Sequence, residues 1–220
     1  MTDPTGRTAR LDPAVVVAEA VRVLDERGLE SVSLRAVADR LGVRMNTVLW
    51  HVKSKARLRE MMADAIIGEV GFEDLPGRWD RRLRELLHRL RRVLLSHPDG
   101  AVLVAGAHAA DPHALRFAEE ITATLLRAGF GTRETSWAVW TLLHLVSGLV
   151  QEEQAPSSPD LTRLRAEIAE ERFPALHSIL GDASATDFAA RFDFAVTAQL
   201  TALRDVLLRN PPEPGFRPPF

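Results

Sequence analysis

The chain has 220 residues, of which 46% are hydrophobic, so it is long enough to bury a substantial core. It contains no cysteine, which excludes disulfides, thiolate metal sites and cysteine nucleophiles. No apolar run approaches the roughly 20 residues of a membrane span, and the N-terminus has no apolar stretch of the secretory type. We therefore expect a cytoplasmic protein.

The net charge of −2 conceals an uneven distribution. Residues 1–60 contain 11 Arg and Lys against 8 Asp and Glu, whereas residues 61–220 contain 17 against 22. A basic N-terminal part on an acidic body is typical of a DNA-reading head on a carrier domain, although many proteins without a nucleic-acid partner share this asymmetry.

The N-terminal part predicts four helices. Residues 1–10 are polar and are expected to be flexible. Asp12-Pro13 is an N-cap followed by proline at the first helical position, and Gly28 ends that helix. Ser33 caps a short second helix, and Ser54 caps a fourth that runs to about Val70. Between them, Leu41-Gly42-Val43 forms a turn before a third helix over 44–52.

The remainder of the chain also predicts helices. Residues 71–78 form a linker, and an amphipathic helix follows over 79–96. Further helices are expected over 101–107, from Asp111-Pro112 to Gly129, over 132–154, over 161–172, and from the Ser184-x-x-Asp187 capping box to about Arg209. Residues 210–220 form a proline-rich tail. No segment alternates with the two-residue period of a strand over a useful length, so the fold class is all-α.

A helix-turn-helix near residues 33–52 is the motif that indicates function. Such a motif needs a small residue where its helices cross, which Ala38 supplies. Gly42 lies four positions later and suits a turn that requires positive φ. Val48 follows six positions beyond and locks the second helix onto the first. The alternative is an ordinary helical corner in a bundle.

The stretch from Asp12 through GLESVSLRAVADRLGV to LWHVKSKARL resembles the DNA-binding domain of the tetracycline-repressor (TetR) family. The C-terminal part is similar, more weakly, to the subclass that gave the family its name. The resemblance implies an all-α fold, with a three-helix head at 11–54 and a helical ligand-binding and dimerisation domain at 55–209. It implies a bacterial, ligand-responsive, homodimeric regulator, by default a repressor, with no enzymatic activity and no cofactor.

The same resemblance implies the DNA-binding residues. Arg35 falls where such repressors place a base-reading arginine, whose guanidinium suits guanine. Lys55 falls on a phosphate-contact position, and Lys53 is the only other lysine of the chain. The complete set is Ser33, Arg35, Arg44, Met45, Asn46, Thr47, Trp50, His51, Lys53 and Lys55. Alternatives stay open for four of them: Trp50 as head core, His51 as a capping residue, and Arg35 and Arg44 as plain surface charges.

The effector is expected to be mainly apolar or aromatic and to bind without a chelated metal. Val104 aligns with the metal-binding histidine of tetracycline-binding members, and Leu86 and Ile121 align with polar drug contacts. The candidate ligand-binding residues are Leu86, Leu90, Leu103, Val104, Phe117, Ile121, Trp137, Trp140, His144 and Glu152. These residues also suit plain bundle core.

The dimer interface is expected on the helices near 132–154 and 184–209. One stripe on the last helix has three- and four-residue spacing, namely Phe188, Phe192, Ala195, Gln199, Leu203 and Val206. The alternative is that this stripe packs inside one chain.

Two other functions are kept open. A helical metal-dependent hydrolase rests only on His108, Asp111 and His113, and Asp111 is already explained as an N-cap. A non-specific architectural DNA-binding protein would have no use for the acidic body and its long apolar helices.

Overall fold

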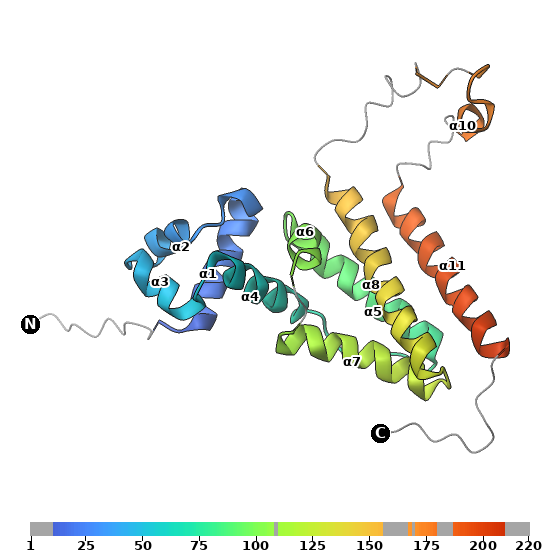
Figure 1. Cartoon of the computed structure of the whole chain (residues 1–220), viewed down its shortest axis with the longest axis horizontal. Helices are drawn as coiled ribbons and strands as arrows, with labels where there is room; N and C mark the ends of the chain where they lie inside the picture. The colour runs from blue at the N-terminus through green and yellow to red at the C-terminus, as the bar shows by residue number, and fades with distance from the viewer. Residues whose placement is uncertain (1–10, 108–109, 156–166, 169, 180–186, 210–220) are drawn as a thin grey trace, which may run out of the picture.

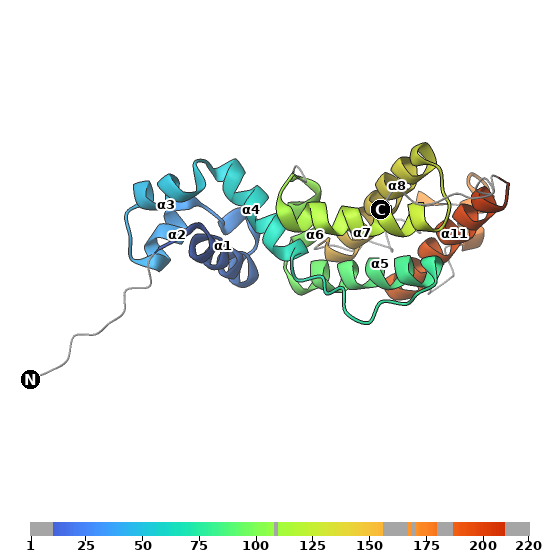
Figure 2. The ribbon, with the colours of Figure 1, turned by 90° about the horizontal axis from the view of Figure 1, so that it is seen from below.

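A computed structural model describes residues 11–107, 110–155, 167–168, 170–179 and 187–209. The described elements are all helical, which confirms the predicted fold class. Figure 1 shows a small N-terminal head built from α1 to α3, joined by α4 to a larger helical body. Figure 2, turned by 90°, shows the head and the body one after the other along the longest axis.

The head contains α1 (Pro13–Arg27), a 3-10 turn η1 (Leu29–Ser31), α2 (Leu34–Leu41) and α3 (Met45–Val52), and α4 (Lys55–Ile67) leads from it into the body. The three predicted caps are confirmed. Asp12 accepts a hydrogen bond from the Val15 amide (2.9 Å), Ser33 from that of Ala36 (3.1 Å) and Ser54 from that of Arg57 (2.9 Å). The fourth helix ends at Ile67, three residues earlier than expected.

The helix-turn-helix has the predicted corner. Ala38 and Val48 are buried, in the head core. Gly42 has φ 65° and ψ 29°, the left-handed conformation that favours glycine. A Cβ atom added at Gly42 would meet no atom within 4 Å, so the requirement for glycine here is one of backbone conformation and not of space.

The body contains α5 (Trp79–Ser96), α6 (Gly100–Ala105), α7 (Pro112–Arg127), α8 (Thr132–Gln154), α10 (Pro174–Ile179) and α11 (Phe188–Arg209). The predicted bounds of α5 and α8 are confirmed. The sequence did not predict α10. Of the helix expected over 161–172, most lies outside the described residues, and 170–172 form a turn.

Helix α5 is central to the body, packing against α6, α7, α8 and α11. Its leucines at 83, 86, 87, 90 and 94 are buried. Helix α11 packs on α5 and α8 through Phe192, Val196, Leu200 and Leu203, all of which are buried within the protomer. Of the stripe expected to face a second chain, Phe192 and Leu203 pack inside this chain, whereas the other four members are only half-buried, namely Phe188, Ala195, Gln199 and Val206.

Helix α4 joins the two parts, because it packs against α1 of the head and against α6 and α7 of the body. A second connection runs through the loop between α5 and α6. There the His97 ring lies 2.7 Å from Oδ1 of Asp25 and 3.2 Å from Oε2 of Glu69. Two residues later, Oδ2 of Asp99 accepts a hydrogen bond from the Leu29 amide (2.9 Å). Side chains from this loop of the body thus contact the end of α1 and the start of η1.

Candidate nucleic-acid interface and internal cavity

The start of α3 presents an exposed and mainly polar surface. Arg44, Met45, Asn46 and Thr47 are all exposed, whereas Val48 is buried and anchors the helix. The residues that hold α3 are therefore separate from those that face outward. Such a helix can enter a DNA major groove with its N-terminal residues toward the base edges.

Trp50 lies outside the head core, since 69% of its surface is exposed. This placement removes the alternative that it mainly packs the head. The Lys53 ammonium lies 5.1 Å from the Trp50 ring centroid and donates a hydrogen bond to the Trp50 carbonyl (2.7 Å). His51 is half-buried, and its Nδ1 has no hydrogen-bond partner among the described residues, so it makes no capping bond through this atom.

Three further DNA candidates lie at helix starts. The Ser33 hydroxyl accepts from an amide of α2, so its first role is that of a cap. The Arg35 side chain is 83% exposed, with its Nε 4.0 Å from Asp39 Oδ2, a contact too long and too exposed to hold the guanidinium. Lys55 is exposed in the first turn of α4. Arg35 and Lys55 are both available to a ligand outside the protein.

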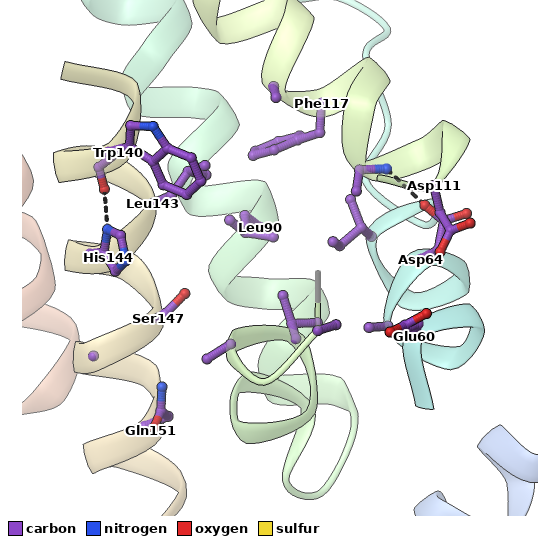
Figure 3. Close-up of a pocket in the computed structure, with 18 residues that line it drawn as sticks. Glu60, Asp64, Leu90, Asp111, Phe117, Trp140, Leu143, His144, Ser147 and Gln151 are labelled. Atoms are coloured by element: carbon purple, nitrogen blue, oxygen red, sulfur yellow. Dashed lines mark hydrogen bonds between the residues drawn. The ribbon is translucent and has the colours of Figure 1, made fainter. Parts of the chain in front are cut away.

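The body contains a partly open cavity of about 320 Å³ between α4, α5, α6, α7 and α8, and Trp140 (59% exposed) and His144 are solvent-exposed parts of its lining. Leu90, Phe117, Trp140 and Leu143 form its apolar part. Figure 3 shows two different ends: Trp140, His144, Ser147 and Gln151 on one side, and Glu60, Asp64 and Asp111 on the other. The volume suits a small organic molecule, and the few polar groups are placed at its ends.

The predicted ligand-binding residues fall into three groups. Leu90, Val104, Phe117, Trp140 and His144 line the cavity. A second group is buried in the core and does not line it, namely Leu86, Leu103 and Ile121. The third group lies on the protein surface: Trp137, and Glu152, whose carboxylate pairs with Arg191 at 2.7 Å.

Asp111 has a different role from the predicted one. It occupies the N-cap position of α7 but makes no capping hydrogen bond. Both of its carboxylate oxygens instead accept from Arg57 of α4, each at 2.6 Å. These hydrogen bonds lower the pKa of Asp111 despite its burial, so the group is ionised at neutral pH. The pair fastens α7 to α4 beside the cavity.

Sequence reasoning missed the contribution of α4 to this cavity. Glu60, Ala63, Asp64 and Ile67 all line it, and Oδ1 of Asp64 accepts a hydrogen bond from the Ala114 amide of α7 (2.9 Å). No local pattern distinguishes these positions from an ordinary amphipathic face. Only the packing of α4 against α6 and α7 shows which face reaches the cavity.

The residues on which the alternative of a metal-dependent hydrolase depended are not brought together. His113 is exposed, Asp111 is engaged by Arg57, and His108 lies outside the described residues. Within the described part of the chain, no three His, Cys, Asp or Glu side chains are grouped so that they could hold a metal ion.

Two family models match the chain. The model described as "Bacterial regulatory proteins, tetR family" matches residues 16–62, which contain the helix-turn-helix. The model described as "Tetracyclin repressor-like, C-terminal domain" matches residues 73–206, more than half of the chain. The chain belongs to the tetR family.

Individual tetR-family proteins are similar over most of their length. The class E tetracycline repressor of Escherichia coli is 33% identical over 150 residues, which cover 67% of this chain and 71% of that protein. A possible TetR family transcriptional regulator from Streptomyces coelicolor A3(2) is 32% identical with a TM-score of 0.78, covering 89% of this chain and all of that one. ActR of Streptomyces coelicolor, solved in complex with (S)-DNPA, is 25% identical with a TM-score of 0.81, covering 90% and 99%.

Membership of the tetR family makes this protein a helix-turn-helix transcriptional regulator, as the sequence predicted. The family consists of regulators and not of enzymes. Its members have the three kinds of partner expected here: duplex DNA, a small effector and a second copy of the chain. None of the helices in the described ranges is both long and apolar enough to span a membrane.

Proposed function

We propose that this tetR-family protein is a cytoplasmic repressor that binds a palindromic operator as a homodimer. A mainly apolar small molecule enters the cavity of each chain and releases the DNA. The proposal assigns DNA binding to residues 11–54, and effector binding and dimerisation to residues 55–209. One observation carries it: α4 lines the cavity on one side and packs against the head on the other.

The DNA part of the proposal rests on the exposed residues of the head. One recognition helix reads too few base pairs, so two heads related by a two-fold axis are needed, and the operator acquires the same symmetry. Arg35 reads a base, and the exposed start of α3 enters the groove. Lys53 and Lys55 contact phosphates, which fixes the position of the head without selecting sequence.

The dimer part rests on the outer faces of α8 and α11. After the inner stripe of α11 has packed on α5 and α8, large apolar side chains remain exposed on both helices, including Trp137, Phe194 (77%) and Leu208. A Cβ atom added at Gly148 would meet nothing within 4 Å, so a neighbouring helix has room to approach α8 there, beside the cavity that Gly148 also lines. Figure 1 shows α8 and α11 side by side at one edge of the body. In the proposed dimer, the same two helices of a second copy pack there and complete a four-helix bundle.

The effector acts through α4 because the cavity and the head share that helix. A ligand that wedges against Ala63 and Ile67 moves α4, and with it the separation of the two heads. To change the dimer from mostly bound to mostly free, the effector must favour the DNA-free arrangement by about 5.5 kcal/mol. This free-energy difference is the sum over the two cavities of the dimer.

The test begins with unbiased selection of bound DNA by the purified full-length protein. We expect a palindrome with two half-sites, and recovery of random or asymmetric sequences would contradict the proposal. Compounds that release the selected operator are then tested on two variants of α6. Val104→Trp fills the cavity and should block release, whereas Val102→Trp, at an exposed position of the same helix, should not. Release should persist in the presence of a metal chelator.

The affinities of the purified protein for the selected operator and for unrelated DNA distinguish the alternative, a non-specific architectural DNA-binding protein. A specific regulator binds its selected operator at least about 10³-fold more tightly than unrelated DNA at physiological salt, whereas an architectural protein does not.

A further inference from the structure

The carboxylates at one end of the cavity are more numerous than the positive charges that accompany them. Glu60, Asp64 and Asp111 all line that end (Figure 3). Among the described residues that line the cavity there is no arginine or lysine. Arg57, which does not itself line the cavity, forms ion pairs with Glu60 and Asp111.

Arg57 is fully engaged by two of the three acids. Its two amino groups donate to Asp111 at 2.6 Å each, and one of them also donates to Glu60 at 3.1 Å. Asp64 uses Oδ1 to accept from the Ala114 amide (2.9 Å), in the first turn of α7. The positive charges here are one guanidinium and the partial charge at the N-terminus of α7, and the negative charges are three carboxylates. This end of the cavity therefore carries net negative charge.

The opposite side of the cavity suits an aromatic ring system. Trp140 and Phe117 present aromatic surface, Leu90 lies between them, and the His144 ring is 5.7 Å from that of Trp140. The carboxylates at the other end are partly buried, so their negative charge makes the entry of an anion costly and that of a cation favourable.

Building on the proposed function, we infer that the effector is an aromatic molecule that carries a cationic amine. Its rings lie between Leu90, Phe117 and Trp140, and its amine lies at Asp64 and Glu60. Such an effector is still mainly apolar and carries its positive charge at one end. A different explanation of the acids is purely structural: Asp64 and Asp111 would only hold α7 on α4. The two explanations differ in what they predict for ligand selectivity.

The experiment compares three probes of similar shape by calorimetry on the full-length protein at neutral pH. 9-Aminoacridine is a cation, anthracene is uncharged, and anthracene-9-carboxylate is an anion. DNA is omitted, because acridines bind duplexes themselves. We expect the cation to bind at least about tenfold more tightly than either analogue, which corresponds to 1.4 kcal/mol.

The decisive variant is Asp64→Asn, which removes the charge and keeps an oxygen that can accept from Ala114. It should remove most of the preference for the cation while leaving the affinity for anthracene within about twofold. Glu60→Gln gives a second, independent removal of charge, and Glu119→Gln, at an exposed position of α7 outside the cavity, should change nothing. Thermal unfolding of each variant verifies that it is folded.

Equal binding of all three probes, preference for the anion, or an unchanged preference in both Asp64→Asn and Glu60→Gln would overturn the inference. Binding of anthracene that is lost in Val104→Trp would still show an effector cavity, so the proposed function would stand while the inference fell. Operator release that is insensitive to Val104→Trp would instead refute the proposed function.

Discussion

The contact of His97 with Asp25 and Glu69 predicts a pH dependence of stability. Burial alone would lower the pKa of His97, but hydrogen bonds from its ring to these two carboxylates outweigh burial and raise the pKa above 6.5. A raised pKa means that the folded protein binds the proton more tightly than the unfolded chain. The stabilisation is therefore complete below the unfolded pKa and is lost as pH rises through the folded pKa.

The size of this effect has an upper bound. One group can contribute at most one proton of difference between the folded and unfolded states, so the free energy of unfolding falls by at most about 1.4 kcal/mol per pH unit. For a chain of 220 residues this corresponds to at most about 3–6 °C in Tm per pH unit. His97→Gln keeps a neutral donor and removes the titration.

The assay is thermal unfolding of the wild type and of His97→Gln between about pH 6 and about pH 9 at constant ionic strength. The stability difference between them should shrink as pH rises. His113→Gln, at an exposed position, is the control. His88, whose pKa burial lowers, is unchanged in all three proteins, so its opposite effect cancels. Parallel pH profiles for the wild type and His97→Gln would refute the claim that the contact of His97 with Asp25 and Glu69 stabilises the fold.

Three further predictions concern the head and the dimer. Leu203→Asp should unfold the protein, because the side chain is buried between helices, whereas Phe194→Asp should give a folded monomer. Circular dichroism and sedimentation distinguish the two outcomes, and a folded monomer of Leu203→Asp would contradict the prediction. Arg35→Ala should cost about 1–3 kcal/mol of discrimination at one base pair per half-site, whereas Lys55→Ala should weaken binding to all sequences alike and flatten its salt dependence. Binding titrations at several salt concentrations test both variants, and the reverse pattern would contradict the assignment. Trp50→Ala should leave stability within about 0.5 kcal/mol, because its side chain is exposed, and should reduce operator affinity; a large loss in Tm would argue against the exposed placement.

The sequence by itself determined the local structure of this protein. The caps at Asp12, Ser33 and Ser54 and the bounds of α5 and α8 were predictable, because hydrogen bonds over three or four residues and proline or glycine signals act within one turn. The corner at Gly42 was predictable for the same reason, since the required backbone conformation is a property of that residue.

The tertiary structure alone decided which face of each helix meets which neighbour. Asp111 carries a capping signal, yet its carboxylate is bound to Arg57, 54 residues earlier in the chain. Leu86 and Leu90 have the same periodicity on α5 and are both buried, but only Leu90 also lines the cavity. Helical periodicity identifies an apolar stripe without identifying what covers it, because that depends on the packing of segments distant in the chain.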